Sequence, residues 1–591
     1  MKSTILTWDI ETWGIEEKWR LPPETMFRLG GYAWGDGPVQ ITTSLNEMRS
    51  VIREAEYVIG HNIHQFDLTV LFGKDSTEPL DLALANRVYD TWSDAPVVLP
   101  YPESYEHYTG VIKGVNGPAS AKSFYSLNNL AFQLGTVPKV NSISDLAKKW
   151  GGFEKIPLDD KDYNEYLIGD VEASRELAAL MMSRWPWSEY RARNQRVHGI
   201  LAQISRNGFE IDVTQATSRI KTLNDQKDLH LGQLQRDYGL PTTGKAPLRT
   251  KVGKAAVLAA LASVGVSEDE LPLTPTGAPK LGGKDILEAV KGKGDAAELL
   301  ANSLAIISGT RMTAETLLRN RQPDGRAHPE ITALQRSGRL SFTEPGLTVI
   351  GSRGDGANDK KIIVAKEGHL LVELDFSGAD TRAVCAYSGD EDFYRDYVLG
   401  DPHTTSAKLI WPDDELLPGG KHPQRQRAKP VTHGSAYRIG ATKLAKMTGI
   451  TLFEAENFLR ALERNYAKRT AWQNRVTGTG KWTGHVVSHW GRELPVDVGR
   501  AYTQSCAQLG QNATLEIMCD GLLSLPVRLI ERCVGLIHDA ALFELAEETV
   551  QEDVALIKAA FERTFHPVDG IPVTFELEAG TPGHSWFDGS H

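Results

Sequence analysis

Acidic side chains recur at three places in the first 170 residues, and their types suit the binding of divalent cations. Asp9 and Glu11 in "ILTWDIETW" are two residues apart on a predicted strand, so both point to one face. Taken alone, this pair fits an edge strand with a polar face equally well. Asp67 follows a second predicted strand in "GHNIHQFDLTVL", and Asp170 lies one helical turn after Tyr166 in "YLIGDVEAS".

Together these side chains fit a site that cleaves phosphodiesters with two metal ions. Carboxylates suit Mg²⁺ or Mn²⁺. Two such cations about 3.5–4 Å apart would stabilise the attacking and leaving oxygens. We therefore predict that Asp9, Glu11, Asp67 and Asp170 bind metal and that Tyr166 orients the attacking water.

A second possible reaction centre lies in the C-terminal half. Asp375 ends the apolar run "LLVELD", which is typical of a buried strand, and Asp539 lies in the turn of "LIHDAAL". Either aspartate alone is ordinary, because Asp is common at strand ends and in turns. As a pair, they would bridge incoming phosphates through two cations.

A basic helix supplies the remaining parts of phosphoryl transfer. In "RQRAKPVTHGSAYRIG", Arg425, Lys429, His433 and Tyr437 recur at every fourth position and share one helix face. By itself this stretch fits a solvated basic helix. Beside Asp375, it indicates cations that neutralise phosphate charge and rings that meet a base or sugar.

The elements that must position these residues change along the chain. The first ~185 residues alternate strand-like runs, such as "STILTW" and "AEYVIGHN", with helix-like runs, such as "DYNEYLIGDVEASRELAALMMSRW". We predict a long loop or insertion at 90–125 and a helix break at "RWPWSEY". The next region is helical, with two Pro/Gly/Lys loops that fit either linkers or phosphate contacts. Further on we predict a helix over "TLFEAENFLRALERNYAKRTAW", opened by a capping box, two strands around a tight turn in "CVGLIHDAALFELA", and one strand in "IPVTFELEAG".

Composition limits the class of protein. The chain has 591 residues, is 41% hydrophobic and carries a formal net charge of −11, which argues against a uniformly basic nucleic-acid coat. Four cysteines without a CxxC pair indicate neither a disulfide framework nor a zinc site. No signal peptide or bilayer-spanning run is evident, so we expect a soluble, intracellular protein.

In their order along the chain, these motifs resemble those of the family A DNA polymerases, the DNA polymerase I type, in their phage-encoded form. "DIET", "HNIHQFD" and "YLIGD" are similar to the three motifs of the proofreading exonuclease. Six further stretches resemble the family's polymerase motifs, namely "SGRLSFTEPGL", "LDFSGADTRAVCAYSGD", "GDPHTTSA", "RQRAKPVTHGSAY", "HWGRELP" and "IHDAALFE". The resemblance runs over nearly the whole chain.

The resemblance implies an α/β and α+β multidomain fold, in which an RNase H-like exonuclease domain precedes a right-hand polymerase domain of palm, fingers and thumb. No 5′-nuclease domain and no thumb insertion for a thioredoxin-type factor are expected. The implied boundaries are 1–187 for the exonuclease, 188–591 for the polymerase, about 205–325 for the thumb, about 326–400 and 500–591 for the palm, and about 400–500 for the fingers.

The resemblance also implies roles for individual residues. Asp375 and Asp539 would be metal ligands, Lys429 the general acid for pyrophosphate, and Arg425 a contact of the leaving phosphates. Nucleotide contacts are implied for Arg425, Lys429, His433, Tyr437, Asp380 and His403. DNA contacts are implied for Arg339, Arg500, Gln504, Gln508 and His538.

Several positions depart from the family pattern. Asp380 stands in place of the nucleotide-selecting Glu and is one methylene shorter, and His433 stands where Phe or Tyr is usual. Pro430 lies inside the basic helix, which it should kink. Ala540 replaces the acid after the His-Asp pair, and Gln504 replaces an Asn. Sugar and base discrimination, including the use of a modified nucleotide, therefore stay open.

We predict a template-directed DNA polymerase for phage DNA replication, which extends a primer with dNTPs and carries a 3′-5′ proofreading exonuclease. Mg²⁺ or Mn²⁺, two per active site, are the implied cofactors. Primer–template DNA and dNTPs are the implied partners, and a replisome helicase and primase are further candidates. We expect a monomer without membrane contact, in the bacterial host cytoplasm if the chain is phage-encoded.

Two other interpretations fit part of the sequence. A DNA exonuclease with a degenerate, DNA-holding polymerase half is suggested by Ala540, Pro430 and His433. A non-enzymatic DNA-binding scaffold is disfavoured, because two sets of carboxylates repel phosphate unless metal is present.

Overall fold

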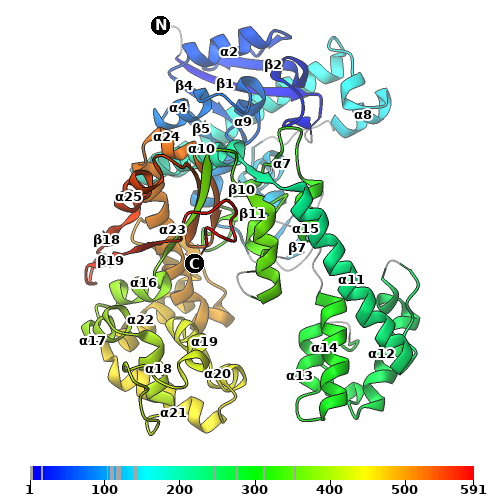
Figure 1. The fold of residues 1–591 in the computed structure, drawn as a ribbon. Helices are drawn as coiled ribbons and strands as arrows, with labels where there is room; N and C mark the ends of the chain where they lie inside the picture. Colours follow the sequence, from blue (N-terminus) through cyan, green and yellow to red (C-terminus); the bar gives the residue numbers. More distant parts are fainter. Residues whose placement is uncertain are drawn as a thin grey trace. The chain divides into compact units, whose positions relative to one another are not determined.

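The computed structural model describes two compact units. The described residues are 4–14, 17–102, 104–106, 112–114, 121–136, 143–244, 246–274, 277–309, 313–351 and 354–590. The first unit comprises Met1–Glu210, Gln322–Thr348 and Ala365–His591, and the second comprises Ile211–Arg321 and Val349–Val364 (Figure 1). The predicted domain boundaries were drawn from motif positions and stay predictions.

A five-stranded sheet forms the N-terminal part of the first unit. Its order is β3-β2-β1-β4-β5, in which β1 to β3 are antiparallel and β4 and β5 run parallel to β1. The strands are β1 (Ile5–Thr12), β2 (Phe27–Trp34), β3 (Gln40–Thr42), β4 (Tyr57–Gly60) and β5 (Val88–Asp90). The helix α9 (Lys161–Arg184) packs against β1, β2 and β4. The predicted strands at "STILTW" and "AEYVIGHN" and the helix ending at "RW" are thereby confirmed.

The prediction of a long loop over residues 90–125 is wrong at its start. Residues Thr91–Val98 form the helix α5, because the Asp90 carboxylate accepts the backbone N–H of Trp92 at 2.9 Å and caps it. The aromatic residues of this region pack into one cluster with Leu177 of α9, and they include Trp92, Tyr101, Phe124 and Tyr125. Residues 103, 107–111 and 115–120 lie outside the described part of the chain.

The helix α10 (Glu189–Asn207) connects the N-terminal sheet to the rest of the first unit. It follows α9 after the predicted break at Trp-Pro-Trp, which is confirmed. Most of its residues are buried. Arg193 forms ion pairs with Glu516 at 2.6 Å and Asp520 at 2.7 Å, and Asn207 donates to the carbonyl of Cys533 at 2.7 Å.

A second sheet, antiparallel in its strand pairs, has the order β16-β17-β13-β20. Its strands are β16 (Cys533–Ile537), β17 (Ala540–Ala546), β13 (His369–Phe376) and β20 (Leu577–Ala579). The predicted pair of strands around a tight turn is confirmed. The single strand predicted in "IPVTFELEAG" is wrong, because β19 (Val573–Phe575) pairs with β18 (Arg563–Phe565) while β20 pairs with β13. Glu576 separates the two strands.

The helices α16 (Ala379–Ser388), α23 (Ala501–Ser524) and α25 (Val550–Phe561) share a continuous apolar core with this sheet. The same core extends into five helices, namely α18 (Pro402–Ile410), α19 (Arg425–Ala436), α20 (Ala441–Thr448), α21 (Leu452–Asn465) and α22 (Ala467–Thr483). The predicted capping box of Thr451 and Glu454 is confirmed. The single helix predicted there is wrong, because the chain breaks at Tyr466, whose buried ring packs edge-on against Phe393.

The second unit is helical, as predicted for this stretch. Its helices are α11 (Val213–Tyr238), α12 (Lys251–Ser263), α13 (Gly283–Ala289), α14 (Asp295–Gly309) and α15 (Thr313–Arg319). Leu234 of α11 joins residues of α12 to α14 in a separate apolar core. The predicted basic loops include Lys245, Pro275 and Thr276, which lie outside the described residues, so their role stays a prediction.

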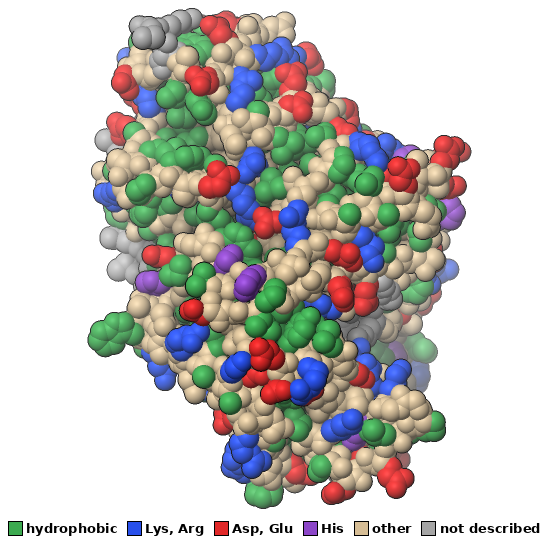
Figure 2. Space-filling model, turned by 90° about the vertical axis from the view of Figure 1, so that its left-hand side faces the viewer, with side chains coloured by type: hydrophobic (Ala, Val, Ile, Leu, Met, Phe, Trp, Pro, Cys, Tyr) green, Lys and Arg blue, Asp and Glu red, His purple; other side chains and the backbone are tan. Residues whose placement is uncertain are grey.

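Surface charge and hydropathy set two limits. On the face drawn in Figure 2, Lys and Arg side chains are interspersed with Asp and Glu rather than gathered into one field. Through the described residues, no helix has the length and apolar character needed to cross a membrane.

Candidate active sites and nucleic-acid interface

The two aspartates of the C-terminal half meet at one end of the second sheet. Asp375 pairs in register with Ala540, the residue that follows Asp539, and the N–H of Phe376 donates to the carbonyl of Asp539 at 3.2 Å. Asp539 lies in the tight turn between β16 and β17, and the pairing of β17 with β13 brings this turn to the end of β13 that carries Asp375. His538, predicted to contact DNA, occupies the same turn with an exposed side chain and a φ of 57°.

Burial and charge repulsion together raise the pKa of both aspartates. Burial and the negative charge of Asp539 raise the pKa of Asp375 to about 7. Burial and the charge of Asp380 raise the pKa of Asp539. The Asp375 Oδ1 atom is buried and accepts no hydrogen bond from any described residue. A divalent cation would satisfy this oxygen and remove the repulsion, so the donor set fits Mg²⁺ or Mn²⁺.

Further carboxylates flank Asp375, and motif reasoning missed them. Glu578 of β20 lies directly opposite Asp375, on the side away from Ala540, and Glu373 lies two residues earlier on β13. Both add to the negative charge that Asp375 experiences. The alternation in "FELEAG" could have placed Glu578 on a polar face, but only strand pairing shows which residue it faces.

The helix α19 carries the predicted cations Arg425 and Lys429. Arg425 forms a two-pronged ion pair with Asp401, at 2.6 Å and 3.1 Å, and Lys429 follows one turn later. This pairing holds the pKa of Asp401 well below its usual range and raises that of Arg425. Asp401 also caps α18 and was not among the predicted site residues.

Other predicted nucleotide contacts lie close to this helix. The His403 ring Nδ1 lies 3.2 Å from the Thr432 hydroxyl of α19. The helix extends unbroken through Pro430 and His433, whose side chains lie outside the described part. The kink expected at Pro430 and the stacking expected of His433 therefore stay predictions.

Tyr437 and Asp380 are joined directly. The Tyr437 hydroxyl donates to Asp380 Oδ1 at 2.6 Å, and Arg339 Nη2 lies 3.7 Å from the same oxygen. Burial and the Asp380 charge raise the pKa of Tyr437 well above its ordinary value. The structure thus brings Tyr437 and Asp380, the two implied nucleotide contacts, together with Arg339, an implied DNA contact, and the shorter Asp still reaches the tyrosine.

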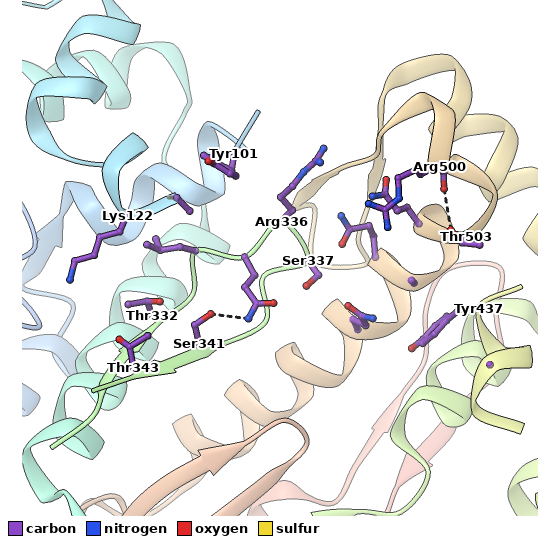
Figure 3. A pocket seen from close by; sticks show the side chains of 18 of the residues that line it. Tyr101, Lys122, Thr332, Arg336, Ser337, Ser341, Thr343, Tyr437, Arg500 and Thr503 are labelled. Atoms are coloured by element: carbon purple, nitrogen blue, oxygen red, sulfur yellow. Dashed lines mark hydrogen bonds between the residues drawn. The ribbon is translucent and has the colours of Figure 1, made fainter. Parts of the chain in front are cut away.

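A cavity of about 1200 Å³ opens beside these residues within the first unit (Figure 3). Tyr101 and Lys122 line one side, and Tyr437 and Arg500 line the other. The lining also includes Gln504, Gln508, Arg336, Ser337 and Lys443. Cations, amides and two aromatic rings are the side chains that contact nucleic-acid backbones and bases.

The predicted DNA-contacting amides are held by the protein. Gln504 exchanges two hydrogen bonds with Asp497, at 2.8 Å and 2.9 Å, and Gln508 donates to the carbonyl of Pro495 at 2.7 Å. Arg336, which the sequence did not single out, pairs with Asp497 at 2.6 Å. These contacts orient the side chains along one wall of the cavity.

A separate group of acids lies in the N-terminal sheet. Asp9 and Glu11 of β1 and Asp170 of α9 place carboxylate oxygens within 4.8 Å of one another. Across the residues that the structure describes, no other group of three His, Cys, Asp or Glu side chains meets this spacing. Tyr166 lies one turn before Asp170 and is partly buried. The donor set and its spacing fit a divalent cation.

Asp67 adjoins this group. It is the first residue of α3 (Asp67–Phe72) and is buried. Burial and then the charge of Asp9 raise its pKa well above the usual range. Nearby, burial lowers the pKa of Lys18 to about 8, and the Lys18 ammonium donates to the carbonyl of Gln65 at 3.1 Å. Lys18 was not among the predicted site residues.

The fold combines helices and sheets and carries two groups of acidic side chains, one in each of the two large sheets. The family model of DNA polymerase family A matches residues 273–588. This chain therefore belongs to the family A DNA polymerases. The match begins at residue 273, so the N-terminal acids lie outside it.

Known proteins support the same assignment. A thermostable DNA polymerase I of Thermus filiformis is 30% identical over 341 residues, which are 54% of this chain and 40% of the relative. A DNA polymerase of Mycobacterium phage D29 is 26% identical, over 41% of this chain and 39% of the relative. These alignments thus span about 40% of the curated relatives' length.

A solved structure matches almost the entire fold. It is the POL domain of Pol1 from M. smegmatis, in complex with DNA primer-template and dNTP. The TM-score is 0.76, with 99% of this chain and 96% of that chain covered. The sequence identity is 17%, so this match concerns the fold.

Proposed function

We propose that this chain is a template-directed DNA polymerase that extends a primer with dNTPs. The observation that carries the proposal is the meeting of Asp375 and Asp539 at one end of the sheet, with family A membership over residues 273–588. The M. smegmatis structure is a complex with DNA primer-template and dNTP, which supports these substrates here.

The chain's own residues would act on the nucleotide as follows. Asp375 and Asp539 would hold Mg²⁺ or Mn²⁺, whose charge would neutralise the incoming phosphates. Arg425 and Lys429 on α19 would bind the triphosphate, and Lys429 would give a proton to the leaving pyrophosphate. Asp380, fixed by Tyr437 at 2.6 Å, would stand against the ribose 2′-hydroxyl. His403 and His433 would complete the nucleotide contacts.

The duplex would lie along the wall formed by Arg500, Gln504 and Gln508, with Arg339 and His538 as further contacts. Amide donors can test base-pair geometry through minor-groove acceptors that every pair presents. Template pairing would then choose the sequence, while the protein reads shape and backbone. We also propose the second unit as the thumb, the helices from α18 to α22 as the fingers, and the second sheet as the palm.

We further propose a 3′-5′ exonuclease in the N-terminal sheet, with Asp9, Glu11, Asp67 and Asp170 as the ligands of two Mg²⁺ or Mn²⁺ ions. The strand order β3-β2-β1-β4-β5, with three antiparallel and two parallel strands, supports an RNase H-like domain. Tyr166 would orient the attacking water. Because unpairing costs least at a mismatch, a frayed primer end would reach this site preferentially.

The biological setting is likewise a proposal. The similarity to a phage D29 polymerase supports a role in phage DNA replication in the cytoplasm of a bacterial host. We propose a monomer that works beside a replisome helicase and primase.

Paired substitutions test the two assignments in one experiment. Asp375→Ala or Asp539→Ala should abolish primer extension and spare the degradation of single-stranded DNA. Asp9→Ala with Glu11→Ala should abolish degradation and spare extension. If either change removes both activities equally, the assignment of two separate sites is wrong. If the unaltered chain degrades DNA but never extends a primer, the degenerate-polymerase alternative holds instead.

A further inference from the structure

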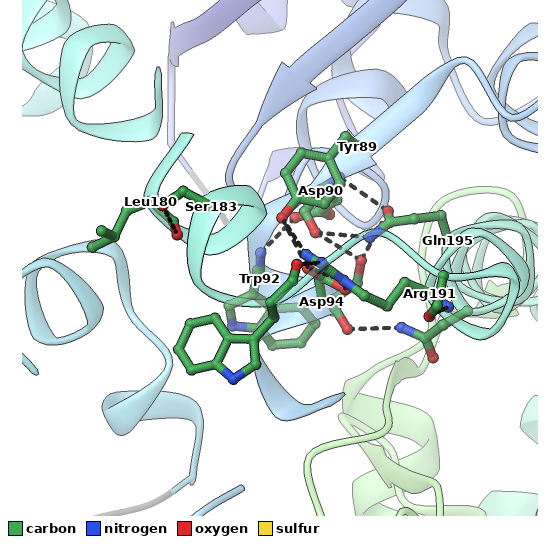
Figure 4. A network of polar contacts seen from close by, with 12 residues as sticks. Tyr89, Asp90, Trp92, Asp94, Leu180, Ser183, Arg191 and Gln195 are labelled. Carbon is green, nitrogen blue, oxygen red and sulfur yellow. Dashed lines mark hydrogen bonds and ion pairs between the residues drawn. The ribbon is translucent and has the colours of Figure 1, made fainter. Parts of the chain in front are cut away.

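A carboxylate outside both acid sites lies at the centre of a buried hydrogen-bond network (Figure 4). Asp90, the last residue of β5, is fully buried. Its Oδ1 atom accepts the backbone N–H groups of Asn62 at 2.7 Å and Trp92 at 2.9 Å, and its Oδ2 accepts that of His64 at 3.1 Å. The Trp92 bond caps α5, whereas the other two hold the segment that follows β4.

This segment, residues 61–66, leads directly to the proposed metal ligand Asp67. Asn62 has a φ of 64°, a left-handed conformation that needs support from its surroundings. Asp90 supplies that support at Asn62 and His64, and the Lys18 ammonium bonds the carbonyl of Gln65. With three nearby points of the backbone fixed, the start of α3 and the Asp67 side chain have a defined place beside Asp9.

The backbone of Asp90 is itself held by the buried helix α10. Gln195 Oε1 accepts the Asp90 N–H at 3.0 Å, and Gln195 Nε2 donates to the Asp90 carbonyl at 3.1 Å. The same Oε1 atom lies 3.3 Å from the His64 ring Nε2. One amide side chain therefore links Asp90 and segment 61–66 to a helix that also bonds the second sheet through Asn207.

We propose that Asp90, held by Gln195, is a positioning residue that sets the location of Asp67 relative to Asp9 and thereby the metal affinity of the N-terminal site. This inference rests on the proposed exonuclease function. Asp90 is not one of the proposed metal ligands; it bonds the backbone of segment 61–66, and its charge adds to the raised pKa of Asp67. Residues that orient metal ligands commonly change metal affinity 10–100-fold when substituted.

The test is Asp90→Asn in the full-length chain. Asparagine has the same size, but one acceptor oxygen becomes an NH₂ donor that faces a backbone N–H. Mn²⁺ binding is measured by electron paramagnetic resonance, and the part lost in Asp9→Ala defines the N-terminal site. We expect Asp90→Asn to weaken that part about 10–100-fold. The Mg²⁺ concentration needed for DNA degradation should rise, while primer extension stays unchanged.

Asp94→Asn is the matched control. Asp94 is as buried as Asp90 and belongs to the same network, but it pairs with Arg191 at 3.1 Å and bonds Tyr89 instead of segment 61–66. It should lower the thermal midpoint and leave Mn²⁺ affinity unchanged. If Asp90→Asn does not fold, Gln195→Leu gives the second test, with an expected loss of several-fold in Mn²⁺ affinity.

The outcomes separate the inference from the proposed function. Unchanged Mn²⁺ affinity in Asp90→Asn, or in Gln195→Leu where that variant takes its place, overturns the positioning role. An equal loss in Asp94→Asn also overturns it, since general destabilisation would then suffice. If the unaltered chain binds Mn²⁺ through Asp9 but never degrades DNA, the exonuclease proposal fails while the positioning role stands.

Discussion

The carboxylates proposed to hold the polymerase metal ions should destabilise the folded chain, and Asp375→Asn measures by how much. Burial and then the charges of Asp539, Glu373 and Glu578 raise the pKa of Asp375 from 3.8 to about 7. Asparagine keeps the shape and removes the charge. We therefore expect the variant to be more stable than the unaltered chain in the absence of divalent cations, although it cannot extend a primer.

The sign of the pH dependence follows from the direction of this shift. Between about pH 4 and pH 7 the folded state binds more protons at Asp375 than the unfolded state, so the free energy of unfolding falls as pH rises. A change from 3.8 to about 7, at about 1.4 kcal/mol per pH unit, gives an upper limit of about 4 kcal/mol. The full penalty is present above pH 7. Solvent screening of this partly buried group lowers the figure.

Thermal unfolding with a chelator tests this prediction. At pH 8 the Asp375→Asn variant should unfold several degrees above the unaltered chain, and the difference should vanish near pH 4. Added Mg²⁺ should stabilise the chain that retains Asp375 more than the variant and so reduce the difference, since both keep the proposed N-terminal site. The exposed Asp413→Asn serves as a control and should not shift the midpoint. Equal midpoints of Asp375→Asn and the unaltered chain at pH 8 would refute the repulsion argument.

Three further predictions concern side chains on or next to the helices from α16 to α21. Tyr437→Phe removes the 2.6 Å bond to Asp380, a charge-assisted bond worth about 1.5–3 kcal/mol. Preference for dNTP over rNTP, measured as a ratio of kcat/KM values, should fall about tenfold or more. An unchanged ratio would count against the proposal that Asp380, fixed by Tyr437, excludes the ribose 2′-hydroxyl. Asp401→Ala removes the carboxylate that orients Arg425, so KM for dNTP should rise several-fold in steady-state extension; an unchanged KM would show that Arg425 needs no such partner. Thr451→Ala removes an N-cap and should cost about 0.5–2 kcal/mol in denaturant unfolding with extension intact, whereas no loss would mean that α21 does not depend on its cap.

The sequence predicted helices and strands correctly where neighbouring residues alone determine them. Strand-like runs predicted β1 and β4, the capping box predicted the start of α21, and the tight turn before Ala540 predicted the pair β16 and β17. The errors arose where partners distant in sequence decide. Tyr466 ends a helix because its ring packs against Phe393, and Glu576 ends a strand because its neighbours pair with different strands.

The candidate sites divide in the same way. The sequence predicted the candidate metal ligands Asp9, Glu11, Asp170, Asp375 and Asp539. Each lies on a strand, in a turn or on a helix face, and these are elements that local sequence spacing reveals. The sequence did not predict four residues near these sites, because the contacts of each come only from the strand, helix or segment that folds against it. These residues are Glu578, Asp401, Lys18 and Asp90.

The sequence by itself determined the family, the types of residue available for chemistry and the elements that carry them, because motifs and periodicity are local properties of the chain. Only the tertiary structure decided which carboxylates come within 4.8 Å, which pKa values rise, and that Asp380 reaches Tyr437 despite its shorter side chain. Those outcomes depend on strand register and helix packing, which join residues that lie far apart along the chain.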